Sequence, residues 1–78
     1  MPQIDLINGV KINIYNGDHR PPHIHVLYNE YEITIIIETR EIYSGRMPKK
    51  QLKIAEKWLE KNKTEALDIF YQLNPELK

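Results

Sequence analysis

The chain has 78 residues, with eleven basic and eleven acidic side chains and a formal net charge of zero at neutral pH. This balance excludes a general electrostatic attraction to nucleic acid. The absence of cysteine excludes disulfides, thiolate nucleophiles and zinc–cysteine sites.

The length fits a single domain over residues 1–78, which would bury only about 60% of the surface of its unfolded chain. The N-terminal residues lack the basic stretch and apolar run of a secretory signal. No apolar segment approaches the about 18 residues of a membrane span. We therefore expect a cytoplasmic protein with no membrane partner.

Residues 3–15 have the pattern of a β-hairpin. Asn8-Gly9 favours a two-residue turn, because both positions tolerate positive φ. The turn predicts two opposite pairs, Ile7 with Val10 and Asp5 with Ile12.

Residues 23–28 and 31–38 alternate as a third and a fourth strand around a turn at Asn29-Glu30. This turn places Val26 opposite Ile33 and His25 opposite Thr34. The predicted core face holds Ile24, Val26, Tyr28, Tyr31, Ile33, Ile35 and Ile37. A tight turn at Thr39-Arg40 predicts a short fifth strand over residues 41–43, with Ile42 on the core face.

After Ser44-Gly45 the apolar period becomes helical. Pro48 suits a first helical position, and Asn62 followed by Glu65 resembles a capping pair, which predicts that the helix breaks and restarts there. Pro75 ends the second helix. The prediction is an α+β domain, an antiparallel meander of about five strands followed by two C-terminal helices packed on one face.

Residues 46–63 carry seven basic side chains against Glu56 and Glu60. Lys49, Lys53, Lys57 and Lys61 recur every four residues and form a stripe along the predicted helix. The stripe suits a phosphate backbone or an acidic partner, but a solvated outer face explains it equally simply, and we favour that interpretation.

All three histidines lie within seven residues of the segment Asp18-His19-Arg20-Pro21-Pro22-His23-Ile24-His25-Val26. Histidine is the commonest metal ligand and the side chain that normally titrates near neutral pH. His23 and His25 are two apart on a strand, so their side chains leave the same face. This segment is the candidate functional site.

Two chemistries fit the segment. A divalent metal such as zinc could bind His23 and His25, with His19 folding back as a third ligand and Glu32 or Glu38 as oxygen donors. Alternatively, two imidazoles could exchange protons with an RNA phosphodiester while Arg20 stabilises the developing charge. Possible helpers are Tyr15, Tyr43 and Arg40. We expect the second, with no cofactor, because no carboxylate lies at a recognised ligand spacing.

A third interpretation assigns the segment no chemistry. Asp18 could accept local N–H bonds and the two prolines could stiffen the loop at the entrance of the strand. His23 and His25 would then be half-buried polar residues on an outward face, available to a protein partner.

Residues 14–26 resemble the signature of a small prokaryotic family catalogued as domain of unknown function four-one-six-zero. Its hallmark is an aromatic residue, a short gap and Asp-His-x-Pro-Pro-His-x-His-Val. The matching residues are Tyr15, Asp18, His19, Pro21, Pro22, His23, His25 and Val26. The resemblance implies a toxin that pairs with a small antitoxin-like protein.

The leading hypothesis is therefore a toxin of a small toxin–antitoxin module that acts on RNA. The candidate catalytic residues are Asp18, His19, Arg20, His23 and His25. The alternatives are a non-enzymatic domain that docks a protein through its histidine-bearing face, and a small metal-binding protein.

Overall fold

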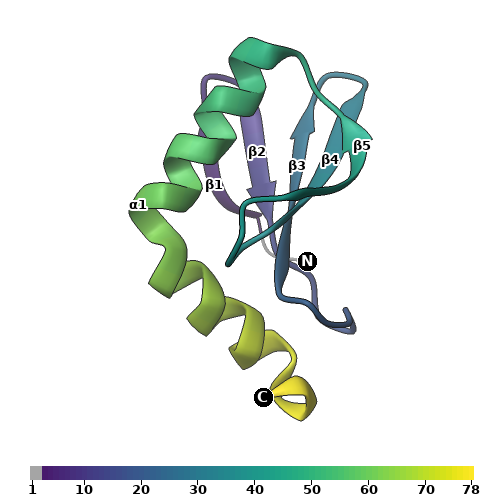
Figure 1. Ribbon diagram of the computed structural model, residues 1–78, viewed down its shortest axis with the longest axis vertical. Helices are drawn as coiled ribbons and strands as arrows, with labels where there is room; N and C mark the ends of the chain where they lie inside the picture. The colour runs from purple at the N-terminus through teal and green to yellow at the C-terminus, as the bar shows by residue number, and fades with distance from the viewer. Residues whose placement is uncertain (1–2) are drawn as a thin grey trace.

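The computed structural model describes residues 3–78 as a five-stranded antiparallel sheet crossed by one long helix (Figure 1). The strands follow one another in the sheet in sequence order, so the topology is a meander. The α+β class is confirmed. The elements are β1 (Gln3–Ile7), β2 (Val10–Asn13), β3 (His23–Tyr28), β4 (Tyr31–Ile36), β5 (Ile42–Arg46), α1 (Lys49–Leu73) and a short 3₁₀ helix η1 (Pro75–Leu77).

The first two hairpins have the predicted registers. Asn8 and Gly9 both adopt positive φ, and Asn29 does so in the second turn. The turn residues therefore set the pairing, as expected for two-residue loops. The confirmed pairs are Ile7 with Val10, Asp5 with Ile12, Val26 with Ile33 and His25 with Thr34.

The core lies between one face of the sheet and α1, which contacts β2 and β3. Strand alternation directs the predicted isoleucines and valines to this face. The buried apolar residues of the strands, with the two that directly follow β2 and β4, are Val10, Ile12, Ile14, Ile24, Val26, Ile33, Ile35 and Ile37. From α1 they meet Ala55, Trp58, Leu59, Ala66 and Phe70.

The predicted break lies where expected, since α1 has a kink with non-helical backbone angles at Asn62, but the helix continues across it, so the prediction of two separate helices was wrong. Asn62 has non-helical backbone angles (φ −120°, ψ 22°), but its side-chain amide donates to the carbonyl of Trp58 at 2.9 Å. The side chain thus bonds to the preceding turn and does not cap a new helix. Among residues 3–78, no helix combines the length and apolar composition that crossing a membrane requires.

The fifth strand is longer than the predicted residues 41–43 and extends further toward the C-terminus, over Ile42–Arg46. The backbone N–H of Arg40 donates to Ile36 at 2.8 Å, so a wider turn replaces the predicted turn at Thr39-Arg40. Ile42 pairs with Ile35, yet it is 48% exposed. Its place on the core face therefore does not bury it, because β5 is an edge strand and α1 packs on β2 and β3.

Gly45 lies inside β5, opposite Ile33, and not in a turn before the helix. Its φ is 86°, and a Cβ added there would collide with the carbonyl oxygen of Glu32 and lie 3.0 Å from the Cα of Ile33. A glycine is therefore required here because β4 and β5 approach each other closely. In the sequence alone, Ser44-Gly45 indicates a turn instead.

Candidate functional site

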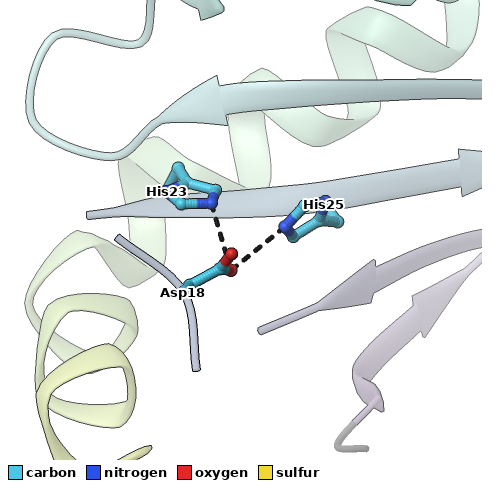
Figure 2. A group of neighbouring side chains, drawn as sticks. All are labelled: Asp18, His23 and His25. Carbon is cyan, nitrogen blue, oxygen red and sulfur yellow. Dashed lines mark hydrogen bonds and ion pairs between the residues drawn. The ribbon is translucent and has the colours of Figure 1, made fainter. Parts of the chain in front are cut away.

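Asp18, His23 and His25 form a cluster, called here the Asp–His cluster (Figure 2), and the two histidines alternate along β3 with the core residues Ile24 and Val26. Asp18 Oδ2 lies 3.1 Å from His23 Nε2 and 3.2 Å from His25 Nε2. The two histidines leave β3 on the same side, as strand alternation predicts, and Asp18 comes from the loop between β2 and β3. One carboxylate oxygen therefore faces both rings.

The end of α1 holds this loop in place through Asn74, a fully buried polar residue. Asn74 Oδ1 accepts a hydrogen bond from the backbone N–H of Asp18 at 2.9 Å. Its amide nitrogen donates to the carbonyls of Tyr15 and Phe70, at 3.0 Å each. The Arg20 guanidinium also donates to the carbonyl of Leu77. The position of Asp18 thus depends on the C-terminal residues.

The two rings have different surroundings. His23 Nδ1 lies 2.7 Å from the carbonyl oxygen of Pro21, and its ring lies 5.7 Å from that of Phe70. The His25 ring lies 4.3 Å from the ring of Tyr15. The buried Nδ1 of His25 has no hydrogen-bond partner within residues 3–78, and the Glu32 carboxylate lies 3.7 Å away.

A row of polar side chains continues from the cluster across the sheet. The register places Asn13 beside His25, His25 beside Thr34, and Thr34 beside Ser44. Residues directly opposite each other share a face. This row of the histidine-bearing face is therefore polar from β2 to β5, whereas Ile36, on the same face beside His23, is apolar.

A pocket of about 180 Å³ opens beside the cluster. It brings all five predicted site residues together with side chains of β4 and β5. The lining residues are Asp18, His19, Arg20, Pro21, His23, His25, Thr34, Ile36, Tyr43 and Ser44.

Residues 9–70 match the family described as Domain of unknown function (DUF4160). The chain belongs to this family. No curated protein and no solved structure matches the chain. The matched residues of this DUF4160 domain include the whole candidate site, whereas Asn74 lies beyond them.

Several predicted roles need correction in this DUF4160 domain. The third group at His23 and His25 is Asp18, and not His19, which lines the pocket without joining the cluster. Arg40 pairs with Glu60 at 3.2 Å and does not line the pocket. Glu38 is exposed in the turn after β4 and lies outside the pocket as well.

Sequence reasoning missed three contributors to the site. Thr34 and Ser44 lie at the site because they pair across β3, β4 and β5 in line with His25. A prediction with the right bounds for the fifth strand would have included Ser44. The sequence marks Asn74 only by its place before Pro75, and no spacing connects it to Asp18. The lysine stripe is exposed along its length, and the ion pairs within residues 3–78 involve none of its four members.

Proposed function

We propose that this domain acts on the phosphodiester backbone of RNA, as the toxin of a small two-protein module. The observation that carries the proposal is the convergence of His19, Arg20 and the Asp–His cluster on one pocket. An imidazole beside a guanidinium supplies proton transfer and charge stabilisation, the two needs of phosphodiester cleavage.

The size of the pocket limits what can enter it. Sites for drug-sized ligands span about 300–1,000 Å³, and this pocket holds about 180 Å³. A single phosphate group suits this volume better than a whole nucleotide does. The flanking sugars and bases of an RNA strand would therefore lie on the surface around the pocket.

The geometry favours His19 as the residue that transfers protons. In the cluster, His23 directs one ring nitrogen at Pro21 and the other at Asp18, and His25 Nε2 also faces Asp18. These nitrogens have partners, and His25 Nδ1 is buried. The exposed ring of His19 has no hydrogen bond or ion pair within the described chain.

In the proposed reaction, the 2′-oxygen of RNA forms a bond to the adjacent phosphorus and the bond from phosphorus to the 5′-oxygen breaks. The 2′-hydroxyl loses a proton to His19, the departing 5′-oxygen takes a proton from solvent water, and His19 releases its proton to the hydroxide left behind. The products are a 2′,3′-cyclic phosphate and a 5′-hydroxyl. Arg20 stabilises the charge on the phosphate with the N–H groups that do not bond Leu77.

Expression of the wild-type chain in a bacterium should slow growth, and purified protein should cut RNA to the two ends named above. His19→Gln and His23→Ala should each relieve the growth defect while circular dichroism shows a folded domain. Gln72→Ala, an exposed substitution on α1, is the matched control and should stay toxic. Normal growth with abundant folded wild-type protein and intact RNA would contradict the proposal.

A second candidate function is protein docking at the edge of the sheet. Ile42 and Tyr43 on β5 are 48% and 68% exposed, and β5 is an edge strand whose outer backbone groups can pair with another strand. Tyr43 also lines the pocket. A small antitoxin-like protein seated there would cover the candidate site.

The docking function is tested by measuring binding to the protein that is encoded by the gene next to the one for this chain. Tyr43→Ser and Ile42→Ser should weaken binding of that protein at least tenfold in a titration, whereas Leu6→Ser, an equally exposed apolar position on the opposite edge strand, should not. Equal binding by all three variants would argue against docking at β5.

A further inference from the structure

We propose that Asp18, His23 and His25 bind one first-row divalent metal ion, such as Zn²⁺, through Asp18 Oδ2 and the two Nε2 atoms. These three atoms lie within 4.8 Å of one another, and both rings direct Nε2 at the Asp18 carboxylate (Figure 2). The metal ion would bind beside the pocket of the proposed function. The inference rests on that proposal only in taking RNA as the substrate that the pocket receives.

The hydrogen bonds of His23 indicate which of its nitrogens can bind a metal. A carbonyl oxygen only accepts, so Nδ1 must donate its proton to Pro21 at 2.7 Å. In the neutral ring, Nε2 then carries a lone pair, and it faces a carboxylate oxygen that also carries lone pairs. Two acceptors 3.1 Å apart need a cation between them, either a proton that makes His23 positively charged or a metal ion.

The distances suit a metal ion shared by both rings. Charge-assisted N–H···O bonds are usually about 2.7–2.9 Å long, whereas both contacts to Asp18 Oδ2 are longer, at 3.1 and 3.2 Å. Two ligand atoms at about 2.0–2.1 Å from a tetrahedral zinc ion are about 3.3 Å apart. One metal ion would satisfy both contacts at once, whereas without it each ring must carry its own proton on Nε2, which leaves His23 positively charged because its Nδ1 proton is also in use.

The groups behind the ligands have the arrangement of a metal centre. A metal-bound histidine normally donates its second ring nitrogen to a carbonyl or a carboxylate, which orients the ring. Pro21 fills this role for His23. The Glu32 carboxylate, 3.7 Å from the otherwise unpartnered Nδ1 of His25, lies where it could fill the same role. Asn74 fixes the backbone of Asp18.

The ligand set selects the class of metal. Two imidazoles with one carboxylate suit zinc, iron and similar ions, whereas magnesium and calcium prefer oxygen ligands throughout. Three protein ligands leave at least one coordination position for water or substrate. This position adjoins the pocket, because all three ligands line it. A bound metal ion would add positive charge beside Arg20.

The test uses the full chain, purified without a histidine tag and treated with a chelator. Titration with Zn²⁺ should give one site per chain and raise the melting temperature, because a ligand that binds only the folded state stabilises it. Mg²⁺ should do neither at the same concentration. No Zn²⁺ binding, or no difference between Zn²⁺ and Mg²⁺, would overturn the inference.

Three variants locate the site. Asp18→Asn, His23→Gln and His25→Gln should each weaken Zn²⁺ binding at least about 100-fold, since even the loss of an outer partner costs about 10–100-fold. Asp18→Asn keeps the hydrogen bond from its backbone to Asn74, and circular dichroism checks the fold of each variant. His19→Gln is the control, because it lines the pocket but lies outside the cluster. Its binding should equal that of the wild type.

The outcomes separate the two proposals, because metal binding is measured without RNA. Unchanged Zn²⁺ binding in all three cluster variants, or its loss in His19→Gln alone, would overturn the metal site. A chain that binds Zn²⁺ at the cluster but leaves RNA intact would contradict the proposed function and leave the metal site standing.

Discussion

Asn74 accepts a hydrogen bond from the backbone N–H of Asp18, a residue 56 positions earlier in the chain, at 2.9 Å. The same side chain donates to Tyr15 and Phe70. One buried amide therefore joins the loop that carries Asp18 to the end of α1. The candidate site is held by the last residues of the chain as well as by the sheet.

Asn74→Ala should lower the free energy of unfolding by about 2–4 kcal/mol, because it removes three hydrogen bonds, two of them to the partly buried backbone of Asp18 and Tyr15. Urea denaturation followed by circular dichroism measures this change. Gln72→Ala, two residues away and exposed, should change it by less than about 0.5 kcal/mol. Equal stability of the two variants would show that Asn74 does not hold the loop.

Gly45→Ala should lower the free energy of unfolding by at least about 3 kcal/mol. The positive φ alone costs about 1–2 kcal/mol for a residue with a side chain, and the new methyl group would also collide with Glu32. Gly17 has a similar φ of 76° with no atom within 4 Å of an added Cβ. Gly17→Ala should therefore cost only about 1–2 kcal/mol, and equal costs would contradict the close approach of β4 and β5.

Trp58 and Asp5 should be energetically coupled. The indole Nε1 of Trp58 donates to Asp5 Oδ2 at 2.8 Å and connects α1 to the edge strand β1. In a double-mutant cycle of Trp58→Phe and Asp5→Ala, the coupling energy should be about 1–2 kcal/mol. Circular dichroism is the suitable probe, since Trp58 is the only tryptophan. Additive effects would mean that the hydrogen bond contributes nothing.

The lysine stripe should not contribute to RNA binding. Its four residues lie on the first part of α1, whereas the pocket is tied to the far end of this helix at Asn74. A variant with all four lysines changed to glutamine should keep the salt dependence of RNA affinity. Each lysine that contacts a phosphate of single-stranded RNA would instead reduce the slope of log K against log salt by about 0.7.

The fold could be predicted largely from the sequence, because its signals are local. Asn8-Gly9 and Asn29 determine two hairpin registers within a few residues, and alternation then assigns every side chain of β2, β3 and β4 to a face. The same alternation predicts that His23 and His25 project together. Family membership rests on the match over residues 9–70.

The tertiary structure decided the features that depend on distant contacts. Ile42 is exposed because α1 packs on β2 and β3 and leaves the edge strand uncovered. Asp18 faces both histidines because the loop folds back and Asn74 holds its backbone. Turn and strand patterns act over a few residues, whereas a hydrogen bond across 56 positions forms only when the helix has packed on the sheet. The sequence by itself thus determined the strands, their faces and the histidine pair, and only the packed helix brought a carboxylate to that pair.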